Sequence, residues 1–221
     1  DYSGKGMFVT TLRDPREVRS TAAYFDETGL YAYGRQPEAV SWALAQLGGA
    51  LSLVCPTPLL EAELKRYAPA FQEGLRHAVF GRLNLAQGDF RKDLEFIQTT
   101  FDWLQAVQAD FAQFFHDWYC GAASDARAAL SPQAALYARA DFTPVRDGLG
   151  ARTGAGNDEF LAHAYWARPR PANLLIEEVE ALWAPIAADD DWSMFEAKLA
   201  EIEDLKQALG GPCHGAVAQP S

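Results

Sequence analysis

The chain has 221 residues, with 19 Lys and Arg against 30 Asp and Glu, and a formal net charge of −11. A surface this acidic repels phosphate backbones and anionic lipid, which argues against nucleic-acid or membrane-surface partners. A chain of this length can bury roughly 70% of its unfolded surface, which suits one domain or two small ones. No apolar run reaches the roughly 20 residues that span a bilayer, since Pro56 and Pro58 interrupt the most apolar stretch.

The cysteines and the N-terminus bear on the cellular setting. Cys55, Cys120 and Cys213 are odd in number and far apart in sequence, which argues against a disulfide framework or a zinc knuckle. With no basic-then-apolar secretory signal, we expect a reducing, cytoplasmic protein. The chain starts on Asp1 rather than Met, and we expect it to be part of a longer protein.

The N-terminal part lacks a sustained helical period. Glycines and an Asp-Pro pair punctuate residues 1–35, which predicts an irregular segment with short strands near 7–12 and 30–33. Pro37 suits the first turn of a helix, because its missing N–H has no helical partner there. Apolar residues then recur at steps of four and three and predict an amphipathic helix: Val40, Leu44, Leu47 and Leu51.

Helical patterns dominate residues 36–209. Helices are predicted from Thr57, with a kink or division at Pro69, and over about 89–118, 131–139, 172–186 and 192–209. The 89–118 helix has the clearest apolar stripe, read as core: Leu94, Ile97, Phe101, Leu104, Phe111, Phe115 and Trp118. The glycine-rich stretch 147–158 predicts an exposed loop and a candidate subdivision. The sequence therefore predicts a mainly α fold, with a flexible tail over 210–221.

No complete catalytic constellation stands out. The four histidines lack the i, i+4 spacing of a zinc-binding helix, and no nucleophile or phosphate-loop motif is present. His116, beside Asp110, Asp117 and Trp118, is expected to make an ordinary hydrogen bond in or near the core. Cys213-His214 is an alternative metal or thiol site, weakened because ligands in a mobile tail lose entropy on ordering.

Five short motifs, in order, resemble the selenoprotein O (SelO, YdiU) family. The family patterns are D-Y-G-P, G-[RL]-Y-x-[YF]-x-x-Q-P, W-N-L-x-x-L-A, K-L-G-L and D-Y-T-x-F-F-R. The matching residues here are Asp1-Tyr2-Ser3, Gly29 to Pro37, Trp42-Ala43-Leu44 with Leu47, Arg82 to Leu85, and Asp110 to His116. A looser similarity runs over 171–199.

This resemblance implies a pseudokinase-like protein adenylyltransferase, which moves AMP from ATP to a Ser, Thr or Tyr hydroxyl of a protein. It implies the helical C-terminal lobe of a protein-kinase-like fold over 36–209, with 1–35 following a metal-binding aspartate. Asp1 would then hold Mg²⁺. The implied cofactors are ATP and Mg²⁺, and the implied partners are an N-terminal nucleotide-binding lobe and protein substrates.

Several departures leave two hypotheses open. The family's ATP-binding Lys and Arg and its catalytic Asp-Asn precede the position of Asp1, so we expect this chain alone to be inactive and to hold no cofactor tightly. Ser3, Ala43 and Glu177 depart from the family pattern. The alternative is a non-catalytic helical interaction module derived from the same family. A redox role for Cys213 is left open.

Overall fold

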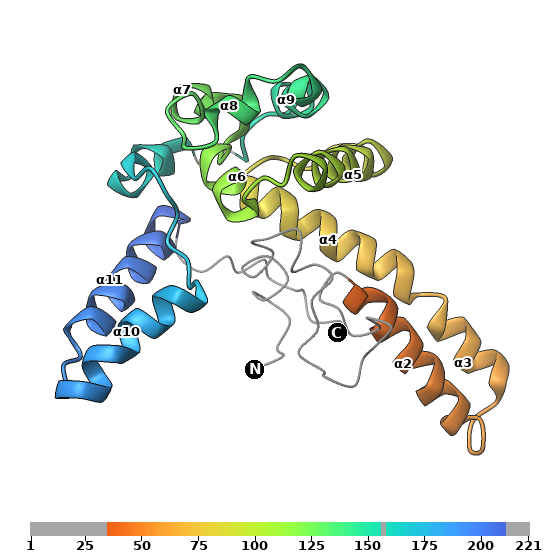
Figure 1. The fold of residues 1–221 in the computed structure, drawn as a ribbon. Coiled ribbons are helices and arrows are strands. Elements are labelled where there is room, and N and C mark those ends of the chain that lie inside the picture. The colour runs from red at the N-terminus through yellow and green to blue at the C-terminus, as the bar shows by residue number, and fades with distance from the viewer. Residues whose placement is uncertain (1–34, 156–157, 211–221) are drawn as a thin grey trace.

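The computed structural model describes residues 35–155 and 158–210, and this part of the chain is mainly helical (Figure 1). Its α-helices are α2 (Gln36–Leu51), α3 (Thr57–Leu64), α4 (Tyr67–Leu83), α5 (Phe90–Val107), α6 (Phe111–Asp117), α7 (Asp125–Ala128), α8 (Ala134–Tyr137), α9 (Thr143–Gly150), α10 (Ile176–Asp189) and α11 (Ser193–Ala208). Four 3₁₀ turns join them: η3 (Gly121–Ser124), η4 (Ala140–Phe142), η5 (Asp158–Ala162) and η6 (Ala164–Ala167). Extended pairing within the described ranges is one isolated bridge, between Leu85 and Gly154.

The prediction of a mainly α fold is confirmed for these residues. Several predictions fall outside the described residues. They concern the strands near 7–12 and 30–33, Asp1, Cys213 and the tail 211–221. Among the helices that are described, none is both long and apolar enough to cross a bilayer.

The main core lies where α4, α5, α6 and α9 meet. The predicted stripe of the 89–118 region is buried here, with Ile97, Leu104 and Trp118 each less than a tenth exposed. The single helix predicted there is wrong, because α5 ends at Val107 and α6 begins at Phe111. Gln108 closes α5 in the left-handed region, with φ 57°, and Asp110 caps α6 by accepting a hydrogen bond from the Gln113 amide at 2.9 Å.

A buried aspartate ties α4, α5 and α9 together. Asp93 of α5 accepts hydrogen bonds from the Gly88 amide at 2.8 Å and from Arg76 and Arg152, both at 3.3 Å. The Arg152 guanidinium also lies over the Phe96 ring, 4.1 Å from its centroid. Because a buried carboxylate must be paired, these two arginines fix the packing of the three helices.

Residues 147–158 are not wholly the exposed loop that the glycines predict. Residues 147–150 form the last turn of α9, and Leu149 is fully buried. Gly148 faces the Phe96 ring so closely that a Cβ there would lie 2.4 Å from Cδ2. Glycine at this position is therefore a packing requirement between α9 and α5, and not a sign of a loop.

Two helical hairpins extend from the central body on opposite sides, α2–α3 and α10–α11 (Figure 1). The predicted division of the helix occurs just before Pro69, since α3 ends at Leu64 and α4 begins at Tyr67, which puts Pro69 in the first turn of α4. The helix predicted over 172–186 starts later and continues past Pro185, because α10 runs from Ile176 to Asp189.

The helix predicted from the apolar spacing after Pro37 is confirmed as α2, and most of its apolar side chains are exposed. Val40, Leu47 and Leu51 are each 40% exposed or more, Trp42 is about half exposed, and α2 has no buried residue. The hairpin α2–α3 is held to α4 by contacts such as the hydrogen bond from the Tyr67 hydroxyl to the Pro37 carbonyl, at 2.9 Å. Within the described residues, α3 packs beside α2 and leaves Leu44 partly covered and most of the stripe exposed.

Candidate functional site

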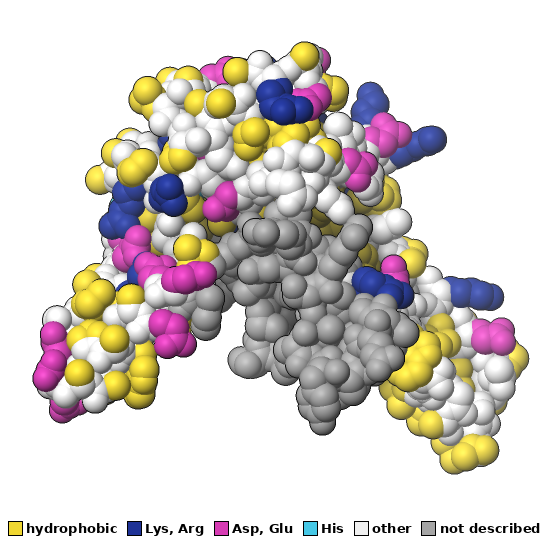
Figure 2. Space-filling model, in the orientation of Figure 1, with side chains coloured by type: hydrophobic (Ala, Val, Ile, Leu, Met, Phe, Trp, Pro, Cys, Tyr) yellow, Lys and Arg dark blue, Asp and Glu magenta, His cyan; other side chains and the backbone are white. Residues whose placement is uncertain are grey.

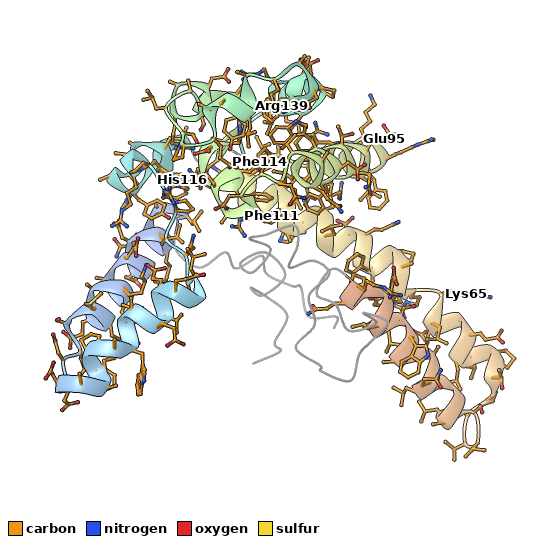
Figure 3. The ribbon with its side chains drawn as sticks, in the orientation of Figure 1. Lys65, Glu95, Phe111, Phe114, His116 and Arg139 are labelled. Carbon is orange, nitrogen blue, oxygen red and sulfur yellow. The ribbon has the colours of Figure 1, made fainter. Side chains whose placement is uncertain are left out.

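The most polar part of the interior is built around the last turn of α6. Phe111, Phe114 and Phe115 anchor this short helix in the core, and His116 and Asp117 follow them at its C-terminal end (Figure 3). All seven residues of α6 are buried. The cap at Asp110 and the three phenylalanines therefore hold two titratable side chains inside the protein.

Asp117 is the centre of a hydrogen-bond network. Its carboxylate accepts from the Gln113 side-chain amide at 2.8 Å, the Ser131 hydroxyl at 2.5 Å and the Tyr137 hydroxyl at 2.7 Å. Burial raises the pKa of Asp117 above its ordinary value, while the three hydrogen bonds act to lower it. Burial likewise raises the pKa of Tyr137. A carboxylate with this many donors is positioned to hold structure together.

Arg127 supplies positive charge to the same region. Its Nη2 donates to the Tyr119 carbonyl at 3.0 Å and to the Ser124 hydroxyl at 2.8 Å. The guanidinium lies over the Trp166 ring, 4.7 Å from the centroid, which is a favourable cation–π geometry. Burial lowers the pKa of Arg127, and the nearby Asp117 charge partly offsets this.

His116 is buried among aromatic rings on the other side of α6. Its Nε2 lies 2.9 Å from the Arg168 carbonyl, and its ring lies close to those of Tyr165 and Trp166. The pKa of His116 is lowered to about 4, chiefly by burial and also by the positive charges of Arg127 and Arg168. The hydrogen bond to the Arg168 carbonyl acts in the opposite direction. The imidazole is therefore neutral at pH 7, and its hydrogen bond confirms the role that the sequence predicts.

A pocket of about 270 Å³ opens beside this network. Its walls come from α6, from the segment 127–131 and from 166–169, and its lining residues are Asp117, Arg127, Leu130, Ser131, Trp166, Ala167, Arg168 and Pro169. Arg168 is already paired with Glu201 of α11 at 2.6 Å. The pocket is thus lined by Asp117, which already accepts three hydrogen bonds, and by Arg127 and Arg168, which have partners of their own. These bonds hold α6, α8, η6 and α11 together.

The structure brings together some predicted residues and leaves others apart. Gln113 links Asp110 and Asp117, since its backbone amide donates to the first and its side chain donates to the second. His116 instead bonds the Arg168 carbonyl, and His163 lies near Asp204. The described residues hold no group of three or more His, Cys, Asp or Glu side chains that could bind a metal ion. Asp1 and Cys213, the residues on which metal and thiol chemistry were predicted, lie outside these residues.

Sequence reasoning missed the partners that come from distant segments. Arg127, Tyr137, Trp166 and Arg168 carried no local motif that would single them out. Ser131 lies at the start of the helix predicted over 131–139, but α8 begins only at Ala134. The Ser131 hydroxyl accepts a hydrogen bond from the Gln133 amide at 3.0 Å, and it also donates to Asp117. Only the tertiary fold reveals this second bond.

Comparison with known proteins identifies the family. A family model described as protein adenylyltransferase SelO matches residues 13–203. The chain belongs to the SelO protein adenylyltransferase family. No solved structure matches the chain.

Three curated SelO-family relatives show the extent of the similarity. The protein nucleotidyltransferase YdiU of Gloeobacter violaceus is 32% identical over 188 residues, which cover 79% of this chain and 37% of that protein. The Rhizobium rhizogenes YdiU is 30% identical over 208 residues, covering 86% and 38%. The human mitochondrial protein adenylyltransferase SelO is 32% identical over 104 residues, covering 47% and 15%. The chain therefore spans well under half the length of these relatives.

The SelO motifs within the described residues are parts of the scaffold. Asn84 takes the place of glycine in K-L-G-L, and it adopts the left-handed conformation, φ 49° and ψ 47°, that glycine and asparagine favour. Its side chain also donates to Cys120 Sγ at 3.1 Å. Arg82 lies over the Phe115 ring, 4.7 Å from the centroid, and burial lowers its pKa to about 10. The motif thus joins the C-terminus of α4 to α6.

Proposed function

We propose that this chain is the helical lobe of a protein adenylyltransferase, which transfers AMP from ATP to a hydroxyl side chain of a protein substrate. The observation that carries the proposal is the match of the SelO family model to 191 of 221 residues, from 13 to 203. The buried network around Asp117 and the Asn84 turn give the lobe a rigid body on which a nucleotide-binding lobe can rest. The kinase-like fold of the whole protein is part of this proposal.

The cofactor belongs to the part of the chain outside the described residues. ATP and Mg²⁺ would be held by an N-terminal lobe together with Asp1, the residue that matches the family's metal-binding aspartate. The described residues do not fit this role, since they hold no candidate metal cluster. Nucleotidyl transfer depends on positioned charges around the phosphates, so the chain alone is expected to be inactive.

The decisive experiment measures AMP transfer in a protein that carries this chain behind a nucleotide-binding lobe. Asp1→Ala is expected to reduce incorporation of labelled AMP by roughly 100-fold or more, because a metal ligand is lost. Asp147→Asn, at an exposed position away from Asp1 in sequence, is the matched control and should leave transfer within about twofold. Near-normal transfer by Asp1→Ala would show that the metal role is wrongly assigned.

The second hypothesis, a non-catalytic interaction module, has one observation in its favour. Both hairpins expose large apolar side chains, which on a folded protein mark interaction sites. ATP binding separates the two hypotheses: the adenylyltransferase should be stabilised against heat by ATP with Mg²⁺, whereas the interaction module should not be. The measurement is a thermal-unfolding curve, with and without nucleotide, of the protein that carries this chain behind a nucleotide-binding lobe.

A further inference from the structure

The hairpin α10–α11 combines exposed apolar side chains with a strong excess of acidic ones. Residues 176–208 contain ten acidic and two basic residues, a net charge of −8. Figure 2 shows acidic and hydrophobic side chains side by side along this arm, with few basic ones. The other hairpin, over residues 35–66, has three acidic and three basic residues. Charge therefore distinguishes the two arms, although both expose apolar side chains.

The apolar side chains of α10–α11 form one stripe on each helix. In α10 the stripe is Val179 and Trp183, and in α11 it is Phe195, Leu199 and Ile202, all between 38% and 58% exposed. The spacings of four, four and three residues place each set along one face.

Both stripes lie on the same side of the hairpin. The two helices are joined by Lys198 of α11, which pairs with Glu178 of α10 at 2.5 Å. The ion pair marks the side on which each helix faces the other. Val179 comes one residue after Glu178, and Leu199 one residue after Lys198. Each stripe is therefore rotated by about 100° around its helix axis from the facing side, in the direction in which the chain advances. In antiparallel helices equal turns of this kind lead to the same side, where the two stripes together border a shallow apolar surface.

Carboxylates flank this apolar surface. Glu180 lies one residue past Val179 on α10, and Glu196 and Glu203 lie one past Phe195 and Ile202 on α11. All three are exposed, and Glu203 pairs on the surface with Lys206 at 3.1 Å. Asp189, Asp190 and Asp191 add three negative charges at the turn between the helices. The rim thus repels anionic surfaces, and it also disfavours a second copy of the same face.

We propose that this face of α10–α11 binds a cationic amphipathic helix of another protein. A helix laid between two antiparallel helices would bury its apolar side against Trp183 and Leu199, and its Lys and Arg residues would meet the flanking carboxylates. Helix α11 has 16 residues, so the face is about 24 Å long and matches a partner helix of similar length. The proposal does not depend on AMP transfer.

The test uses two labelled synthetic helical peptides of about 16 residues with the same Leu pattern, one with Lys and one with Glu at the polar positions. Fluorescence anisotropy with this chain is expected to show saturable one-to-one binding of the Lys peptide only. Trp183→Ala, and Glu180→Lys with Glu196→Lys, should each weaken binding by roughly tenfold. Added salt should weaken it further, since the rim charges are exposed.

The matched control is Glu61→Lys with Asp147→Lys, which changes the net charge equally at exposed positions outside the hairpin. It should leave the affinity within about twofold. Equal weakening by the control pair would overturn the proposal, because the peptide would then respond only to total charge. Equal binding of the Glu peptide, or a dimer of this chain that Trp183→Ala dissociates, would also overturn it. Circular dichroism confirms that each variant is folded.

Discussion

Replacing Gly148 by alanine tests the packing between α9 and α5. The added Cβ would lie 2.4 Å from Cδ2 and 2.8 Å from Cε2 of Phe96. The ring has little room to move, because Arg152 lies 4.1 Å from its centroid and Phe80 packs edge-on at 6.0 Å. Phe96 is itself buried. The substitution therefore overpacks a rigid part of the core.

The expected size follows from two opposing effects. Alanine in place of glycine favours the helix by about 1 kcal/mol. Overpacking a core costs about 1–3 kcal/mol. The net expectation is that Gly148→Ala lowers the free energy of unfolding by up to about 2 kcal/mol. The variant Gly148→Ala with Phe96→Leu should be more stable than the sum of the two single changes predicts.

Urea unfolding followed by circular dichroism measures these changes from the shift in midpoint. Gly150→Ala is the matched control: it lies in the same helix, and its Cβ would meet no atom within 4 Å. It should be neutral or slightly stabilising. If Gly148→Ala proved as stable as Gly150→Ala, the inference that Phe96 is fixed between α4, α5 and α9 would be refuted.

Three further predictions follow from the buried polar groups. The pKa of His116 in the folded protein, about 4, lies below its ordinary value of 6.5. The unfolded chain therefore binds the proton more tightly than the folded protein does. The free energy of unfolding is expected to fall by up to about 3 kcal/mol as the pH falls from 6.5 toward 4. Urea unfolding at pH 7 and at pH 4.5 should show a smaller difference in His116→Gln than in the unsubstituted chain. Asn84→Gly should be tolerated, whereas Asn84→Val should lower the free energy of unfolding by about 1–2 kcal/mol, because the left-handed backbone penalises a β-branched residue and the bond to Cys120 is lost. Asp110→Ala should cost about 1 kcal/mol, since the Gln113 amide loses its cap, and Asp110→Ser should restore most of the loss.

The local features of this fold were predictable where one short segment carried the whole signal. The apolar spacing from Leu94 to Trp118 located a core helix, and the burial of Trp118 confirms it. The break at Gln108 was not predictable, because one residue in the left-handed conformation interrupts a stripe that continues in phase on both sides. Likewise, the glycines of 147–158 suggested a loop, since sequence does not show that Phe96 leaves no room for a side chain at Gly148.

In the candidate site, too, contacts between residues close in the chain were predictable and contacts between distant segments were not. Asp110 and Asp117 are joined through Gln113, which lies between them in the chain, whereas His116 faces the distant segment 165–168. Their partners lie 14 residues away at Ser131, 20 at Tyr137 and 52 at the Arg168 carbonyl. No local pattern links segments so far apart, so the network could only be found in the tertiary structure.

By itself the sequence determined a mainly helical, acidic protein of the SelO family, because helical period and family motifs depend on residues close together in the chain. Only the tertiary structure decided which apolar stripes are covered. The stripes of α5 and α10–α11 look alike in sequence, yet Ile97 is buried and Leu199 is half exposed. Burial depends on a second surface that comes from elsewhere in the chain. Within the described residues α5 is covered by such a surface, whereas the apolar surface of α10–α11 around Leu199 is not.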